Sequence, residues 1–162
     1  MLFFNKKKSV ALVGNLSDRF LQIEYNTVRE LLIPGIWGLM QDNYTTFYFD
    51  LTGGFGLAAA ELAFAWYAAE EFRKNPFHFI GLTLREDRLH WPVAWEKRYR
   101  RVSATLHEVV DLSGLDPEAT KTDLERYAAD RSALLICPDE ETELIAYCKA
   151  ENVYVDTLSS LG

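Results

Sequence analysis

The chain has few of the residues that build disulfide frameworks or metal centres. Its 162 residues include two cysteines, Cys137 and Cys148, and three histidines. Two cysteines cannot supply the set of bridges that holds small secreted domains together, so we expect free thiols and a reducing, cytoplasmic setting. The histidines are scattered, and no His, Cys or acidic residues stand at a metal-ligand spacing. The sequence therefore predicts no metal site.

Long apolar runs and an excess of positive charge are also absent. No apolar stretch approaches the roughly 18–20 residues of a membrane-spanning helix, so we expect no membrane association. The lysines at residues 6–8 follow the short apolar start of the chain, whereas a secretory signal places them before it. The formal net charge is −7. Binding to nucleic acid is disfavoured, because phosphate-rich surfaces need clustered Lys and Arg.

The residues that are present favour one folded domain spanning 1–162. Apolar residues make up 49% of the chain, which is enough for a sizeable core. Strand-like runs alternate with helical periodicity, and this predicts a Rossmann-like three-layer α/β/α fold with a mostly parallel sheet of about six strands. The expected strands are residues 9–13, 46–50, 78–82, 108–112, 133–137 and 153–155. The expected helices are residues 24–42 (kinked or split at Pro34), 57–74, 92–106, 116–130 (capped by Asp116) and 140–150.

The most informative segment is a glycine-rich turn between the expected strand at 46–50 and an Ala-rich helix. Gly53, Gly54 and Gly56 let a ligand approach the backbone closely, and Thr52 adds a hydroxyl donor. Backbone N–H groups and the helix dipole favour an anion at such a position, so we expect a phosphate-bearing small molecule. The alternative is a tight structural turn that requires small residues and positive φ.

A second group of candidates follows the first expected strand. Ligands of open parallel sheets bind at the carboxyl ends of the strands, which places Gly14, Asn15 and Arg19 at the crevice. Arg19 could pair with a phosphate through its planar guanidinium. The alternative is a polar loop in which Asp18 pairs with Arg19.

Glu61 is the remaining candidate, in the first turns of the Ala-rich helix. Its carboxylate could hold a ribose hydroxyl or act as a general acid, which makes it a weak catalytic candidate. The alternative is an acidic residue favoured by the positive end of the helix dipole.

Three segments together resemble the YpsA-like proteins. Residues 91–99, WPVAWEKRY, are similar to the stretch W-P-x-x-W-x-x-R-Y of that family. Residues 126–136, RYAADRSALLI, are similar to R-Y-M-V-D-x-S-x-x-L-I. Residues 52–61, TGGFGLAAAE, are similar to T-G-G-A-L-G-x-D-x-x-A-A-E. The resemblance covers nearly the whole chain.

The YpsA-like family belongs to the SLOG superfamily, which includes DNA-binding DprA-type proteins and the "lonely guy" phosphoribohydrolases. The resemblance implies a Rossmann-like fold and a nucleotide-derived ligand, and it implies no settled reaction. The chain departs from the family at residues 138–143, which carry three acidic residues in a row where a Gly-Gly-Thr loop is usual. Glu61 also comes one residue later than the phosphoribohydrolase glutamate, a rotation of about 100° on a helix, and Leu57 replaces the threonine.

These observations lead to a first hypothesis and two alternatives. The first hypothesis is a non-catalytic binder of a nucleotide or ADP-ribose-like ligand that requires no other cofactor. One alternative is an N-glycosidase (phosphoribohydrolase) that uses Glu61. The other is a degenerate scaffold that acts through contacts with a protein partner or within a homo-oligomer.

Overall fold

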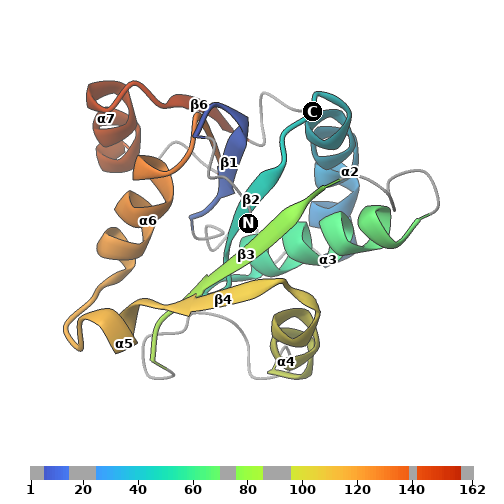
Figure 1. Ribbon diagram of the computed structural model, residues 1–162, viewed down its shortest axis with the longest axis horizontal. Helices are drawn as coiled ribbons and strands as arrows, with labels where there is room; N and C mark the ends of the chain where they lie inside the picture. The colour runs from blue at the N-terminus through green and yellow to red at the C-terminus, as the bar shows by residue number, and fades with distance from the viewer. Residues whose placement is uncertain (1–5, 15–24, 70–75, 86–95, 139–141, 158–162) are drawn as a thin grey trace.

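The computed structural model describes residues 6–14, 25–69, 76–85, 96–138 and 142–157. Six strands form one sheet in which every neighbouring pair is parallel, in the order β4-β3-β2-β1-β5-β6 (Figure 1). The strands are β1 (Ser9–Leu12), β2 (Thr46–Asp50), β3 (His78–Thr83), β4 (Glu108–Asp111), β5 (Leu134–Cys137) and β6 (Tyr154–Thr157). The predicted α/β fold with a parallel sheet is confirmed.

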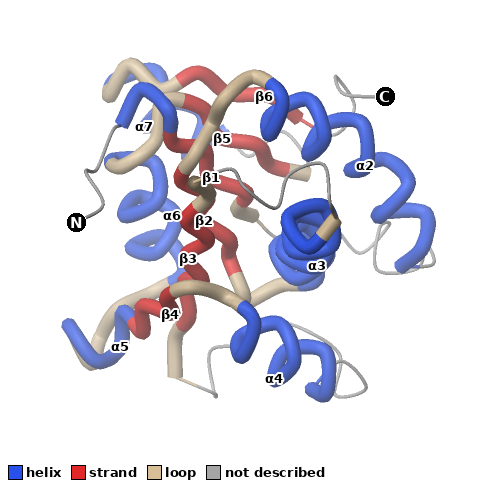
Figure 2. Tube along the Cα trace, turned by 45° about the vertical axis from the view of Figure 1, so that its right-hand side comes forward, coloured by secondary structure: helices blue, strands red, loops and turns tan. Residues whose placement is uncertain are grey.

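Helices cover both faces of the sheet (Figure 2). The helical segments are η1 (Lys6–Lys8), α2 (Tyr25–Gln41), α3 (Gly54–Ala68), α4 (Glu96–Thr105), α5 (Leu112–Leu115), α6 (Lys121–Asp130) and α7 (Thr142–Ala150). The helices α2, α3 and α4 lie on one side, and α5, α6 and α7 lie on the other. None of the helices within the described ranges is both long and apolar enough to cross a bilayer.

Each face of the sheet has its own hydrophobic core, and β1 shows why. Val10 and Leu12 point into the core beneath α2 and α3, whereas Ala11 and Val13 point into the core beneath α6 and α7. All four side chains are fully buried. A parallel strand covered on both sides is apolar along most of its length, and the apolar run at residues 10–13 is the signal that indicates β1 in the sequence.

The strand order creates a switch point beside β1. The connections from β1 to β4 build the sheet in one direction, while β5 and β6 are added on the other side of β1. Crevices for ligands form outside the carboxyl ends of the strands at such a point. The segments that follow β1 and β2 therefore lie where a ligand is expected.

The helix predictions need three corrections. The helix α2 runs through Pro34 without a break, so the predicted split is wrong. The helix α3 begins at Gly54, three residues earlier than predicted, and it ends at Ala68, where the extended backbone of Ala69 forms the C-cap, so the predicted end at residue 74 is also wrong. Part of the predicted helix at 92–106, together with the acidic residues 139–141, lies outside the described residues.

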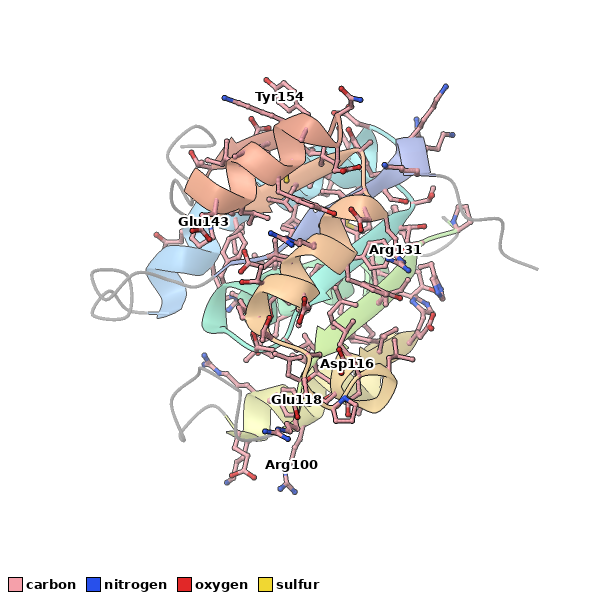
Figure 3. All side chains as sticks on the ribbon, turned by 90° about the vertical axis from the view of Figure 1, so that its left-hand side faces the viewer. Arg100, Asp116, Glu118, Arg131, Glu143 and Tyr154 are labelled. Atoms are coloured by element: carbon pink, nitrogen blue, oxygen red, sulfur yellow. The ribbon has the colours of Figure 1, made fainter. Side chains whose placement is uncertain are left out.

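The third correction concerns the start of α6. Asp116 ends the short helix α5, and its carboxylate accepts a hydrogen bond from Glu118 N at 3.0 Å (Figure 3). The N-cap of α6 is Thr120, which forms a capping box with Asp123. Because the box satisfies two backbone donors reciprocally, it sets the helix start four residues after the predicted cap.

Candidate functional site

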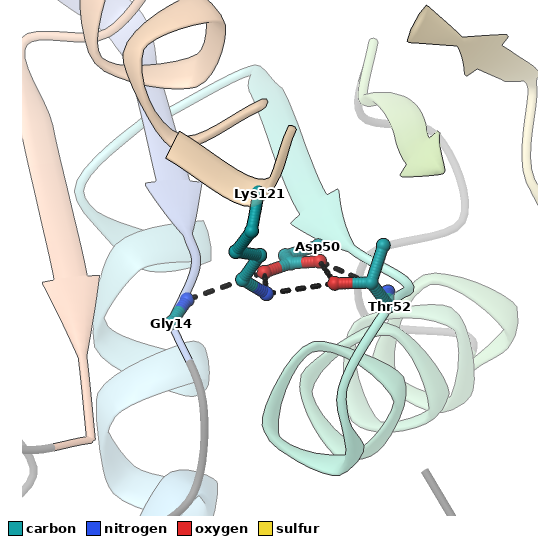
Figure 4. A network of polar contacts seen from close by, with 4 residues as sticks. All are labelled: Gly14, Asp50, Thr52 and Lys121. Atoms are coloured by element: carbon teal, nitrogen blue, oxygen red, sulfur yellow. Dashed lines mark hydrogen bonds and ion pairs between the residues drawn. The ribbon is translucent and has the colours of Figure 1, made fainter. Parts of the chain in front are cut away.

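A network of polar contacts joins three elements at the carboxyl ends of β1 and β2 (Figure 4). Its centre is Asp50, the last residue of β2, whose side chain is fully buried. One carboxylate oxygen, Oδ1, accepts hydrogen bonds from Thr52 N at 2.9 Å and from Thr52 Oγ1 at 2.6 Å. The other oxygen, Oδ2, accepts from Gly14 N at 3.3 Å and from Lys121 Nζ. The buried charge thus has a cation and three neutral donors.

Lys121 is the first residue of α6, and it reaches the network from the opposite face of the sheet to α3. Its ammonium also donates to Thr52 Oγ1 at 2.7 Å, and 15% of its side chain is exposed. The capping box of Thr120 fixes the start of α6 and therefore the position from which Lys121 extends. A buried carboxylate is costly without a partner, so this ion pair is needed for the site to hold its shape.

The structure explains why two positions beside Asp50 are occupied by glycine. Gly14 has φ 116°, a left-handed conformation that side chains rarely adopt, and this conformation presents its N–H to Asp50. A Cβ on Gly56 would lie 1.7 Å from the carbonyl oxygen of Asp50. The first turn of α3 therefore lies directly against the backbone at the end of β2, and only glycine fits there.

The N-terminus of α3 is buried, and its electrostatics favour an anion. Its N-cap is Gly53, in an extended conformation, and no side chain caps the helix. The first turn contains no acidic residue. Thr52 directly precedes the N-cap, and its hydroxyl accepts a hydrogen bond from the ammonium of Lys121. The ammonium and the positive end of the α3 dipole are therefore two sources of positive potential close together.

The structure brings some of the predicted site residues together. Gly14 and Thr52 meet in the network, and Gly53, Gly54 and Gly56 form the adjoining start of α3. In the described part of the chain only Gly14 among the glycines has positive φ, so close packing explains Gly56 and left-handed backbone does not.

Of the other predicted site residues, only Glu61 lies in the described part of the chain. Asn15 and Arg19 lie outside the described residues. Glu61 is half-buried on α3, seven residues beyond Gly54 and therefore about 10 Å further along the helix axis. No hydrogen bond of the described network includes Glu61.

Sequence reasoning missed the two charged residues at the centre of the network. Asp50 was visible as the residue that ends a buried strand directly before the glycine turn. Lys121 gave no local signal, because it lies 71 residues beyond its partner and meets it only through the packing of α6 on the sheet.

The described residues offer little for metal or thiol chemistry. They contain no group of three or more His, Cys, Asp or Glu side chains that could hold a metal ion. Cys137 and Cys148 form no disulfide and are buried in the core beneath α6 and α7. Burial, together with Glu125 and Asp130, raises the pKa of the Cys148 thiol to about 11. This thiol is protonated near neutral pH and is a poor nucleophile.

Comparison with known proteins adds no narrower assignment. No protein-family model matches this chain, and no curated protein matches it either. The chain has an α/β fold with a six-stranded parallel sheet and Rossmann-like alternation of strands and helices.

Proposed function

We propose that this domain binds a nucleotide or ADP-ribose-like ligand at the carboxyl ends of its central strands, without turning it over. The observation that carries the proposal is the ammonium of Lys121, hydrogen-bonded to Thr52 Oγ1 beside the uncapped start of α3. A phosphate is the ligand group that such an arrangement attracts, because it can accept hydrogen bonds from backbone N–H groups and pair with a cation.

The donors that remain after folding define how the phosphate would be held. An ammonium has three protons, and the described contacts of Lys121 use two of them, on Asp50 and Thr52. The third can reach a phosphate oxygen. The first backbone N–H groups of α3 have no partner within their helix and supply the other contacts. Asp50 orients Lys121 and does not meet the anion, since its own oxygens are already occupied.

The resemblance to YpsA-like members of the SLOG superfamily supports the choice of a nucleotide-derived ligand. The segment of that resemblance closest to the network is 52–61, which includes the turn and the start of α3. A hydrolytic reaction is less favoured, because Glu61 lies two helical turns from the proposed phosphate position.

A ligand screen tests this proposal directly. The melting temperature of the full chain would be measured with AMP, ADP, ADP-ribose, NAD and cyclic nucleotides, followed by calorimetry of any compound that raises it. Binding to the folded state alone raises the melting temperature with ligand concentration. The shift should disappear in Gly54→Asp, which places a carboxylate at the start of α3, and in Lys121→Met, each compared with its own ligand-free value.

A matched control separates the site from the overall charge of the protein. Lys149→Met removes a lysine from the exposed last turn of α7 and should leave the ligand-induced shift unchanged. No shift with any of these compounds would overturn the proposal and favour a scaffold that acts through protein contacts. Release of a free base that is abolished by Glu61→Gln would instead identify a glycosidase.

A further inference from the structure

A groove of about 410 Å³ lies between α2 and the half of the sheet formed by β5 and β6. It is separate from the network at Asp50, none of whose residues line it. Leu134 and Ile136 of β5, both nearly buried, lie in its lining together with Leu39 of α2. These side chains give the groove an apolar floor, and its volume is in the range of small-molecule sites.

Gly38 leaves space for an occupant in one wall of the groove. It lies within α2, where glycine is less favourable than alanine because it gains backbone freedom on unfolding. A Cβ at this position would meet no atom within 4 Å. Within the described residues, packing therefore gives no reason for glycine here, and its effect is to keep the groove open.

Among the described residues, the lining of the groove contains two carboxylates and no basic side chain. Asp42 directly follows α2 at the negative end of the helix dipole, and the last turn of that helix has no basic residue to offset it. Asp156 belongs to β6. No ion pair in the described part of the chain includes Asp42 or Asp156. The lining is thus complementary to a cation.

The two carboxylates lie toward opposite ends of the groove. The sheet register pairs Asp156 with Ile136, and Ile136 lies at the level of Phe49 through the pairings of Leu12. Tyr44 and the preceding Asp42 lie at the other end, before β2 begins. From Tyr44 to the level of Phe49 is five residues, or roughly 16 Å along the strand direction at 3.3 Å per residue, and β6 also lies three strand spacings from β2 across the sheet. A ligand that meets both carboxylates must be long and carry a positive charge at each end.

We propose that this groove binds an elongated aliphatic polyamine. One terminal ammonium pairs with Asp42 and the other with Asp156, while the methylene chain covers Leu134 and Ile136. Tyr44 and Tyr154 line the groove, and their rings can attract ammonium groups through cation–π contacts. Tyr154 is 70% exposed at the edge of the molecule, so its ring is accessible to such a ligand (Figure 3).

Calorimetry on the full chain with putrescine, spermidine and spermine at physiological salt tests this inference. Affinity should rise with the length of the polyamine, because only the longer molecules reach both carboxylates. Asp42→Asn and Asp156→Asn should each weaken the binding of spermine about tenfold or more. Gly38→Leu should abolish binding, since its side chain enters the groove, while the melting temperature stays the same or rises.

The control variant is Glu30→Gln, on the exposed side of the same helix and outside the groove. It removes the same charge and should leave binding unchanged. Equal weakening by Glu30→Gln and Asp156→Asn would overturn the proposal, because it would mean general attraction of polycations to an acidic protein. Unchanged affinity in Gly38→Leu would also overturn it. If Gly38→Leu fails to fold, the two aspartate variants decide the question.

Discussion

At the carboxyl end of β2 the carboxylate of Asp50 is surrounded by donors from the chain itself, whereas Asp42 and Asp156 in the groove along α2 pair with no cation among the described residues. The first charge is fully buried, and leaving it without a cation would be costly to the stability of the fold. The other two lie in an open groove, where water can solvate them. Asp50 is thus neutralised by contacts within the fold, whereas Asp42 and Asp156 remain available to a ligand.

This comparison also limits what each site can bind. The anion proposed to bind near Asp50 would meet only the donors that folding leaves unused, which are one proton of Lys121 and the first backbone N–H groups of α3. In the groove a ligand would meet two carboxylates, neither of which is in an ion pair with another described residue. An anion therefore suits the first site and a cation the second, although the chain as a whole has a formal net charge of −7.

The largest expected effect comes from breaking the buried ion pair. Lys121→Met should destabilise the protein by about 3 kcal/mol or more, because it leaves the carboxylate of Asp50 buried without a cation. Urea unfolding monitored by circular dichroism measures this change.

The double variant Asp50→Asn with Lys121→Met supplies the control. It should recover part of the lost stability, since no uncompensated charge remains. A loss below about 1 kcal/mol in Lys121→Met alone would mean that the pair behaves like an exposed surface ion pair, and the distinction drawn between the two regions would be wrong.

Two glycines, one from each region, give the next contrast. Gly56→Ala should cost about 3 kcal/mol, at the upper end for overpacking, because its Cβ would collide with backbone atoms of Asp50. Gly38→Ala should instead stabilise the protein by about 1 kcal/mol, since its Cβ meets open space within a helix. Thermal and urea unfolding of the two variants under the same conditions compare them. Equal changes in the free energy of unfolding for the two variants would contradict the distinction between a close-packed Gly56 and a Gly38 that faces open space.

The cap of α6 is expected to matter less. Thr120→Ala removes the hydroxyl that accepts from Asp123 N and should cost about 1 kcal/mol. It should also weaken the ion pair between Lys121 and Asp50, because the capping box fixes the helix start from which Lys121 extends. Asp116→Ala is the matched control, because Asp116 lies in the same segment and does not cap α6. A greater loss from Asp116→Ala would mean that the original sequence prediction identified the more important cap.

The sheet could be predicted from the sequence because its strands leave a strong local signal. Parallel strands covered on both faces are short, continuously apolar runs, and β2 was predicted with the bounds it has in the structure, Thr46–Asp50. The glycine turn after β2 was equally visible, since its residues are neighbours in the chain.

The parts that could not be predicted depend on contacts between distant segments. Lys121 meets Asp50 only because α6 lies across the end of β2, and no periodicity indicates this contact. The groove could not be predicted for the same reason, because it forms between α2 and β6, which are more than a hundred residues apart in the chain. The start of α6 was misplaced for a local reason, as Asp-Pro at 116–117 is a familiar helix start but the capping box at Thr120 satisfies more backbone donors.

The smallest predicted effect tests the groove in the absence of any ligand. Asp42→Asn should stabilise the free protein by a few tenths of a kcal/mol, because it removes a negative charge from the negative end of the α2 dipole. The gain should shrink as salt is added, since the charge is exposed and screened. Urea unfolding at low and high ionic strength measures both changes.

The sign of the Asp42→Asn effect distinguishes the two regions most directly. Removing a charged side chain is expected to weaken the protein at Lys121 and to strengthen it at Asp42. The polyamine proposed for the groove would offset the negative charge that opposes folding at Asp42. Destabilisation by Asp42→Asn at low salt would show instead that the fold itself uses this carboxylate, and the groove would lose one of the two anchors assigned to a polyamine.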